Sequence, residues 1–344
     1  MTKGTMDSIR YYYNVGRRGL EYMSEIQGES TGDPSIMILR ECALDKGMKV
    51  EEFVNGTYEC TNGKKTRFFG MPPDSGTAIW LCSNKFATYE LLKKNGFDRV
   101  PYYRKYTLGT INEAREDFKT RDKVAVVKPC SQTFGGTGVT ANIRTVRKLN
   151  KAIFRSLVYG SEYLVEDHIE GDNFRVLCYG DRMLNVVQRL PANVTGDGAN
   201  TIKQLIDKEN VKRVEDRSPF RLYSIKVDKD VEQTLRDKGM SLNHVPADGE
   251  RVFLRTVCNH EAGDETTDIT SIVHPDVISY CEGIMRTINT TLSGIDIITT
   301  DITKPLAESG GVINEVNTSP GLMFHDRATS MKVIDHLFDQ APPR

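Results

Sequence analysis

The segment INEVNTSPG, residues 313–321, places a carboxylate and a carboxamide two positions apart, in Glu315 and Asn317. Its β-prone residues predict a strand, and residues i and i+2 of a strand project from the same face. Asp296, in the neighbouring predicted strand GIDII, could supply a third oxygen donor. Such donors suit Mg²⁺, which proteins usually hold with one or two carboxylates, water and substrate phosphates. The alternative is a solvated strand end followed by a Ser-Pro-Gly turn.

A lysine followed by a group of glycines is a second segment with chemical potential. Lys128 lies near the end of KVAVVKP, a predicted buried strand, and the loop TFGGTGVT follows with Gly135, Gly136 and Gly138. Glycines let backbone N–H groups approach phosphate oxygens closely, and a lysine adds positive charge. The loop is neither a P-loop nor a Rossmann fingerprint, because G-x-x-x-x-G-K-[ST] and G-x-G-x-x-G are both absent. An ordinary glycine-rich turn is the alternative.

The segment LVEDHIEGDNFRV, residues 164–176, is the third candidate. A strand that ends in acidic residues and continues through a glycine turn could hold adenine with backbone groups and ribose with polar side chains. Glu166 and Asn173 are the candidates for these contacts. A polar turn between two strands would explain the same residues without a nucleotide.

The elements around these segments indicate a mixed α+β protein with its candidate residues on strands. GIDIITTD and GGVINEVN are expected to be the last two strands. The other main predictions are a helix over SIMILRECALDKGM, a hairpin over TYECTNGKKTRFF turning at Asn62-Gly63, a helix capped by Ser83 or Asn84, strands over 162–169 and 174–189 with a turn at Gly180-Asp181, and a helix from Pro275 to Leu292.

The length and composition exclude some classes of protein. A chain of 344 residues is too long for one small core, which predicts two or three packed subdomains. Its 46 Lys and Arg nearly balance its 47 Asp and Glu, so charge gives no reason to expect nucleic acid or an anionic membrane as partner. No apolar run approaches the roughly 18 residues of a membrane span, and the N-terminus does not resemble a signal peptide. Seven scattered cysteines indicate reduced thiols, and the prediction is a cytoplasmic enzyme.

Taken in order, the three segments resemble a known family. The succession VVKP, glycine-rich loop, VEDHIEGDNFRV, GIDI and EVNTSPG resembles the ATP-grasp ligases. QRLPANVTGDGANTIKQLID (188–207), HPDV (274–277) and GIDIITTDITKPL (294–306) closely resemble the ATP-grasp module of cyanophycin synthetases. They are similar, less closely, to the glutathione-synthetase half of bifunctional glutathione enzymes. The resemblance extends from about residue 75 to about residue 326.

The resemblance implies an α+β ATP-grasp fold, in which two α+β subdomains clasp ATP after a small α/β N-terminal subdomain. Residues 1–80 would form the N-terminal, substrate-side subdomain, and 331–344 a C-terminal helix or tail. The ATP-grasp domain would cover 81–330, with a lid-like subdomain at about 120–175 and a C-terminal subdomain at about 176–330. Both groups of relatives carry a second catalytic module, for which 344 residues leave no room. A stand-alone enzyme that catalyses one ligation is therefore expected.

The resemblance also implies a reaction. In these ligases a carboxylate attacks the γ-phosphate of ATP, and an amine then attacks the acyl phosphate, giving an amide, ADP and phosphate. Amino acids or short peptides are the implied substrates, ATP and Mg²⁺ (as two ions) the implied cofactors, and a homo-oligomer is one option for assembly. The alternative is a catalytically weak ATP-binding protein or an ATP-grasp phosphotransferase.

The resemblance assigns roles to individual residues. Lys128 would contact the α- and β-phosphates, and the Gly135–Gly138 loop would close over the γ-phosphate. Arg255 would stabilise the acyl phosphate and tetrahedral intermediate; the alternative is a surface arginine at a strand edge. The remaining implied contacts are Glu166, Asp167, His168 and Ile169 to adenine, Asn173 to ribose, and Asp296, Glu315 and Asn317 to Mg²⁺.

Three positions depart from the family pattern. The ribose-binding acid is replaced by Asn173, and Asp264 stands where the related N-L-S-T-G-G stretch has a glycine. The phosphate loop carries Phe134 and is one residue longer. Arg189 lies within the signature, but its type and position alone assign it no role. Because Asp264 is expected close to the reacting groups, this departure affects the identity of the acceptor substrate more than ATP binding.

Overall fold

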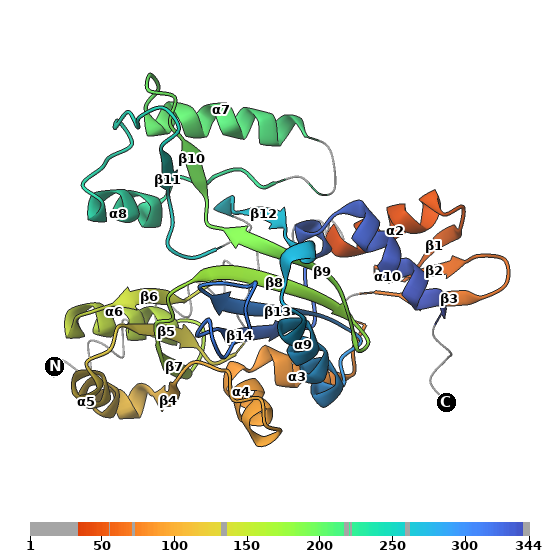
Figure 1. Cartoon of the computed structure of the whole chain (residues 1–344), viewed down its shortest axis with the longest axis horizontal. Helices are drawn as coiled ribbons and strands as arrows, with labels where there is room; N and C mark the ends of the chain where they lie inside the picture. The colour runs from red at the N-terminus through yellow and green to blue at the C-terminus, as the bar shows by residue number, and fades with distance from the viewer. Residues whose placement is uncertain are drawn as a thin grey trace. The chain divides into compact units, whose positions relative to one another are not determined.

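Figure 1 labels the elements of the computed structural model, which divides into two compact units. The first comprises residues 76–169, and the second comprises residues 34–75 together with 170–339. The predicted boundaries lie near residues 80, 120 and 175. Within these ranges the structure describes residues 34–54, 56–70, 73–131, 136–216, 220, 222–258 and 262–339.

The first unit is built on a four-stranded antiparallel sheet in the order β4-β7-β5-β6. Helix α6 packs on this sheet through Leu149, Ile153 and Leu157, which recur at helical spacing. Asn84 caps α4 by accepting a hydrogen bond from the N–H of Ala87 (3.0 Å), as the sequence predicts. The elements are α3 (Gly76–Ser83), α4 (Lys85–Lys94), β4 (Tyr103–Thr107), α5 (Ile111–Arg121), β5 (Ala125–Pro129), β6 (Thr140–Ile143), α6 (Val146–Leu157) and β7 (Glu162–Asp167).

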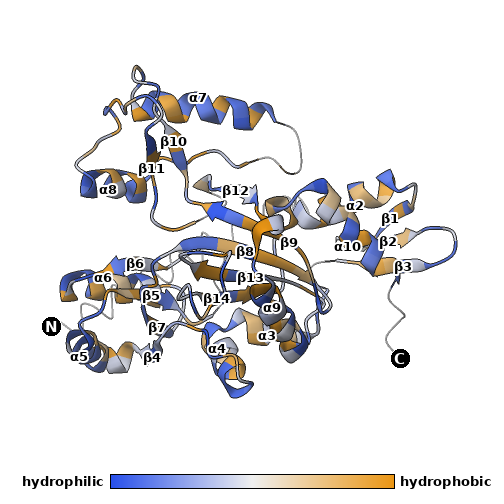
Figure 2. Ribbon diagram, viewed as in Figure 1, coloured by the Kyte–Doolittle hydropathy of each residue, from blue (hydrophilic) through white to orange (hydrophobic). Residues whose placement is uncertain are grey.

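The second unit contains a five-stranded antiparallel sheet in the order β12-β9-β8-β13-β14. β8 and β9 form the predicted hairpin, and the last two predicted strands pair as β13 and β14. Strand β13, which lies between β8 and the edge strand β14, carries mainly hydrophobic residues (Figure 2). The strands are β8 (Asp172–Tyr179), β9 (Arg182–Leu190), β12 (Glu265–Asp268), β13 (Leu292–Thr299) and β14 (Val312–Asn317).

Helix α9 (Pro275–Ile288) packs against β8 and β9 of this sheet. Its start is as predicted, with His274 as the N-cap and Pro275 in the first turn. The predicted end at Leu292 is wrong. Asn289 adopts a left-handed conformation (φ 60°) that ends the helix, and Leu292 begins β13.

The two faces of the five-stranded sheet differ in polarity. Successive residues of a strand alternate between faces, so Val176 and Cys178 of β8 share the face that α9 covers. Arg175, the residue directly before Val176, projects from the other face, beside Asp296 of β13. Helix α9 therefore buries one apolar face, while the polar candidate residues lie on the opposite face, which also carries Leu177 of β8.

Residues 34–69 share a hydrophobic core with the C-terminal helix. Ile38 and Leu39 of α2 cluster with Leu177 of β8 and Ile334 of α10. The predicted hairpin turn is confirmed. The side-chain oxygen of Asn62 accepts hydrogen bonds from the backbone N–H groups of Lys64 (3.0 Å) and Lys65 (2.9 Å). The elements are α2 (Pro34–Asp45), β1 (Lys49–Val54), β2 (Thr57–Thr61), β3 (Thr66–Phe69) and α10 (Arg327–Asp339), with the strands forming a sheet in the order β1-β2-β3.

The described residues between 192 and 254 form a small module within the second unit, here called the α7–α8 module. It has its own core, in which Ile202 and Ile206 of α7 pack with Val231 and Leu235 of α8. Figure 1 shows its elements grouped together at the top of the view. They are β10 (Asn193–Thr195), α7 (Ile202–Glu215), α8 (Lys229–Asp237) and β11 (Arg251–Phe253).

The helices of the described residues are short. The longest, α7 and α9, have 14 residues each, whereas a bilayer span needs about 20. In this part of the chain, no helix combines the length and apolar content that a membrane crossing requires.

Candidate functional site

Three side chains lie in a row across neighbouring strands of the second unit. Asp296 of β13 is opposite Arg175 of β8 on one side and Glu315 of β14 on the other. Directly opposite residues of antiparallel strands project from the same face. Asn317, two positions beyond Glu315, is opposite Gly294, which has no side chain. The sheet therefore places the three predicted Mg²⁺ ligands on one face.

Arg175 fixes the carboxylate of Asp296. Its Nε donates to Oδ1 of Asp296 (2.7 Å) and its Nη2 to Oδ2 (2.8 Å), while its Nη1 donates to the carbonyl of Pro320 (2.8 Å). Gly294 makes room for this arrangement, because a Cβ there would lie 3.2 Å from Cδ of Arg175. Sequence reasoning missed Arg175. The available signal was a charged residue inside an apolar strand, two positions from Asn173.

Arg189 of β9 connects two carboxylates. Its Nη2 donates to Oδ2 of Asp264 (2.8 Å), and its Nη1 is 3.5 Å from Oδ2 of Asp296. Burial lowers the pKa of Arg189, but the carboxylates of Asp296 and Asp264 outweigh burial and raise it overall. Asp264 is fully buried, so this departure from the family pattern neutralises an arginine inside the sheet.

The segment after the Ser-Pro-Gly turn supports both arginines. The guanidinium carbons of Arg175 and Arg189 lie 4.7 and 4.8 Å from the centre of the Phe324 ring, a distance typical of cation–π contact. Gly321 has a left-handed backbone (φ 69°), and a Cβ there would lie 2.6 Å from that ring. A glycine is therefore needed to bring Phe324 beneath the arginines.

The next residue, His325, is buried as a neutral imidazole. The amide nitrogen of Asn185 donates to Asp268 (2.9 Å) and Thr270 (2.8 Å). The amide oxygen of Asn185 is then the acceptor that faces Nδ1 of His325 at 2.6 Å, so Nδ1 carries the proton. Burial, followed by the charge of Arg175, lowers the pKa of His325 to about 3.

This histidine predicts acid sensitivity. Unfolded, the imidazole titrates near its ordinary pKa of about 6.5, whereas in the folded protein it stays neutral down to about pH 3. The unfolded state therefore binds more protons between these values, and stability falls as the pH falls. We expect His325 to account for a loss of about 2–3 kcal/mol between pH 7 and pH 4.5, measured by urea unfolding. His325→Gln should show a smaller pH dependence than wild type, and the exposed-site control His244→Gln an unchanged one. Equal pH dependence in all three proteins would contradict the assignment.

The side chains of Asp296, Glu315 and Asn317 fit a hard divalent cation. The carboxylate of Asp296 has about four lone-pair sites, and Arg175 occupies two. The amide nitrogen of Asn317 is buried without a partner among the described residues, and rotation of the carboxamide would place an oxygen there. In the same part of the chain no three His, Cys, Asp or Glu side chains form a metal-binding group. A cation here would thus have two carboxylates and one amide, leaving positions for phosphate oxygens and water.

In the first unit, Lys128 and Glu166 form a buried ion pair. Nζ of Lys128 is 2.8 Å from Oε2 of Glu166 and also donates to the hydroxyl of Tyr89 (2.8 Å). Both charged residues are 3% exposed. Burial raises the pKa of Glu166, and the Lys128 cation offsets part of this effect. Two residues predicted to contact different parts of ATP are therefore in direct contact with each other.

A second lysine, Lys85, also belongs to this environment, and sequence reasoning missed it. Lys85 is the first residue of α4, is 7% exposed, and its charge acts on Glu166. Its backbone N–H donates to the carbonyl of Cys130 (2.8 Å), which ties α4 to the end of β5. The available signal was its position directly after the predicted cap.

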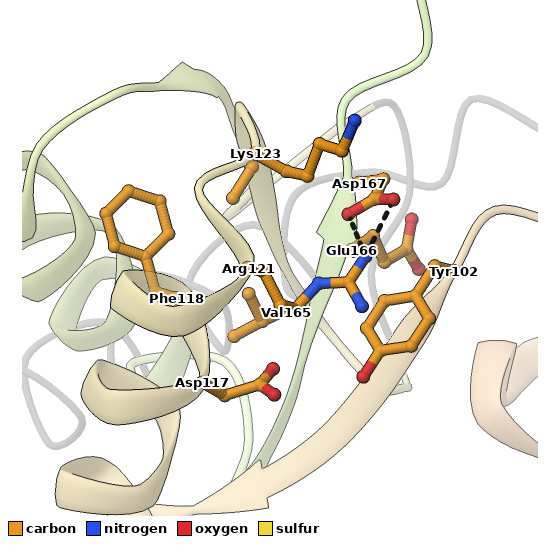
Figure 3. Close-up of a pocket in the computed structure, with 9 residues that line it drawn as sticks. Tyr102, Asp117, Phe118, Arg121, Lys123, Val165, Glu166 and Asp167 are labelled. Carbon is orange, nitrogen blue, oxygen red and sulfur yellow. Dashed lines mark hydrogen bonds and ion pairs between the residues drawn. The ribbon is translucent and has the colours of Figure 1, made fainter.

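The predicted adenine connector, residues 166–169, is anchored within the first unit. The N–H groups of Asp167 and His168 donate to the carbonyls of Tyr102 (3.0 Å) and Val124 (2.8 Å). Arg121 donates to both carboxylate oxygens of Asp167 and stacks on the Tyr102 ring beside a small pocket (Figure 3). These two N–H groups would have to exchange partners before they could bind a base.

The predicted phosphate loop is partly described. Gly135 lies outside the described residues, whereas Gly136 and Gly138 have left-handed backbones (φ 77° and 76°). A Cβ at Gly138 would lie 2.7 Å from the Tyr159 ring and 2.8 Å from Pro129. Packing alone therefore requires a glycine at position 138.

Arg255 and Asn173 lie in the second unit. Arg255 is 9% exposed, so the alternative of a surface arginine is wrong. Its Nη2 donates to Oδ2 of Asp228 (2.7 Å), the N-cap of α8, and to the carbonyl of Lys226 (3.1 Å). Asn173 is opposite Arg189 in the β8–β9 hairpin and shares the face of Arg175.

The two sheets and the candidate residues that they carry can now be compared with proteins of known structure. The structure is similar to the crystal structure of a bifunctional glutathione synthetase from Pasteurella multocida, with a TM-score of 0.64, 23% identity and 90% of this chain covered, against 43% of that chain. The chain has the ATP-grasp fold, which confirms the fold predicted from the sequence. The sequence relatives described next show that it belongs to the ATP-grasp superfamily.

Two relatives make the likeness more specific. Cyanophycin synthetase from Synechocystis sp. is 34% identical over 282 residues, covering 77% of this chain and 31% of that protein. The glutathione biosynthesis bifunctional protein of Clostridium perfringens is 28% identical over 282 residues, covering 77% of this chain and 35% of that protein. The chain thus spans about a third of the length of these relatives. No protein-family model matches it.

Proposed function

We propose that this chain is an ATP- and Mg²⁺-dependent carboxylate–amine ligase. It would form an amide bond between amino acids or short peptides through an acyl phosphate, releasing ADP and phosphate. The observation that carries the proposal is the register of β13 and β14, which sets Asp296 opposite Glu315 with Asn317 on the same face. The names of the relatives, which are synthetases of cyanophycin and glutathione, support an amide-forming reaction.

In the second unit, the chain would supply ligands and orientation. Asp296, Glu315 and Asn317 would hold Mg²⁺, which when bound neutralises charge on the transferring phosphoryl group. Arg175 holds the Asp296 carboxylate in one orientation through two hydrogen bonds, as outer partners of metal ligands commonly do. Asn173 would contact the ribose. The second ion, the cytoplasmic location and a homo-oligomer remain predictions from the sequence.

In the first unit, the chain would supply positive charge and adenine contacts. Lys128 would neutralise the α- and β-phosphates while Glu166 keeps its ammonium in place. The glycine loop that follows β5 would close over the γ-phosphate, and residues 166–169 would meet the adenine. Phosphoryl transfer depends mainly on positioning and charge neutralisation, and these groups provide both.

Arg255 is proposed to act on the acyl phosphate. Its Nε is buried without a partner among the described residues, so it retains a donor for a developing negative charge. We expect Arg255→Ala to lower kcat by roughly 10²–10³-fold while the ATP dissociation constant stays nearly unchanged. Steady-state kinetics and calorimetric titration with ATP test this, with the exposed Arg251→Ala as control. A loss of ATP affinity with normal kcat would contradict the proposed role.

Pairwise substrate screening tests the reaction itself. Phosphate release is measured with amino acids and dipeptides offered in pairs, followed by mass spectrometry of the products. A ligase requires both a carboxylate and an amine, and its product has the mass of the two substrates less one water. Steady phosphate release without any amine would count against ligation and favour a phosphotransferase or an ATPase.

A further inference from the structure

Arg213 of α7 joins the α7–α8 module to the chain around the start of β12. Its Nη1 donates to the carbonyl of Gly263 (2.9 Å), and its Nη2 donates to Oε1 of Glu265 (2.9 Å). Within the module it also donates to Glu209 (3.0 Å) and to the carbonyl of Tyr223 (2.9 Å). The side chain of Arg213 is 2% exposed. A guanidinium with four bonds in a dry environment holds its partners in a single geometry.

These bonds fix both neighbours of Asp264. Arg213 binds the residue before it and the residue after it, while the side chain of Asp264 itself turns to Arg189. Gly263 is also packed closely against the module. Its backbone is left-handed (φ 96°), and a Cβ there would lie 2.8 Å from Cα of Ile225. The carboxylate of Asp264 therefore has its place set from the module.

From Asp264 the contacts continue to the predicted metal ligand. Arg189 bonds to Asp264 at 2.8 Å and approaches Asp296 at 3.5 Å, and Asp296 is bound in turn by Arg175. The charges alternate, so two arginines are balanced by two aspartates. Because all four residues are at most 9% exposed, solvent screens their interactions poorly. Without Asp264, Arg189 would be left with Asp296 as its carboxylate partner, and its positive charge would oppose a cation bound at Asp296.

We infer that Arg213 is a positioning residue that couples the α7–α8 module to Asp296 through Asp264 and Arg189. This inference rests on the proposed Mg²⁺ site. Loss of Arg213 releases the segment around Asp264, and Arg189 then closes on Asp296 and competes with the divalent cation. The expected consequence is weaker metal binding, although the bonds of Arg213 go to Glu209, Tyr223, Gly263 and Glu265 and to none of the proposed metal ligands.

The test uses Mn²⁺ as a spectroscopic substitute for Mg²⁺. Electron paramagnetic resonance measures the Mn²⁺ dissociation constant of the full chain with a non-hydrolysable ATP analogue. We expect Arg213→Met to raise this constant at least roughly 10-fold, the effect typical of lost outer partners of metal ligands. The matched control is Lys212→Met, because Lys212 is the exposed neighbour on α7 and pairs with Glu209 of the same helix. It should bind Mn²⁺ as wild type does.

A double-mutant cycle separates positioning from general destabilisation. Asp264→Asn alone should also raise the constant, and adding Arg213→Met to it should have little further effect. Additive effects, or wild-type affinity in Arg213→Met, would overturn the inference. If Arg213→Met does not fold, Glu265→Gln, which weakens one of its bonds, must still raise the constant for the inference to stand. Failure of the wild-type protein to bind Mn²⁺ with the analogue would instead reject the proposed metal site.

Discussion

Replacing Glu315 with alanine is expected to abolish measurable turnover while the protein still folds. The side chain is half-buried at the end of β14 and belongs to no hydrophobic cluster among the described residues. Its loss removes one of only two carboxylates proposed to hold Mg²⁺, so phosphate release at saturating Mg²⁺·ATP should fall by roughly 10²-fold or more. Thermal unfolding should change by little.

The matched control for this variant is Glu308→Ala. Glu308 is exposed in the connection between β13 and β14, on the same chain segment but outside the row. It should retain the wild-type rate. If Glu315→Ala also retained that rate, Glu315 would not be a metal ligand, and the register of β13 and β14 would no longer support a Mg²⁺ site.

Replacing Lys128 with methionine is expected to cost both stability and activity. It leaves Glu166 without its direct cationic partner in a site where both side chains are at most 4% exposed. Breaking a buried ion pair by removing one partner typically costs about 3–5 kcal/mol. Urea unfolding at pH 7 measures this loss. The loss should be smaller at acid pH, because burial already raises the pKa of Glu166 and a proton can then neutralise it.

A second substitution distinguishes an unpaired charge from a packing defect. Lys128→Met combined with Glu166→Gln removes both charges and should regain part of the lost stability, without regaining phosphate release. Lys123→Met, an exposed lysine of the same unit, is the control and should be neutral. A double variant as unstable as the single one would show that the cost comes from packing.

Local chemistry explains what could be predicted from the sequence. Asn84 caps α4 and Gly180-Asp181 turns the β8–β9 hairpin, because such signals act within a few residues. The same holds for Glu315 and Asn317, whose spacing alone places them on one face. The end of α9 was missed because Asn289 adopts a left-handed conformation that an unbroken apolar periodicity concealed.

Contacts between distant segments could not be predicted in this way. Arg175 meets Asp296 because β8 pairs with β13, a register that no local pattern encodes. The same is true of Lys128 and Glu166, which were assigned to different parts of ATP but lie together on neighbouring strands. Arg213 could only be recognised from its bonds, since in sequence it is one of several basic residues of α7.

The segment after the Ser-Pro-Gly turn has two attachments. Phe324 lies beneath the two arginines, whereas Leu322 is embedded in the cluster formed by α2 and α10, where its N–H donates to the Ser35 hydroxyl (3.1 Å). Helices α2 and α10 thus support the segment that packs beneath the proposed metal site. Mutational scanning should therefore find inactivating substitutions in these two terminal helices, at positions that no ligand would ever touch.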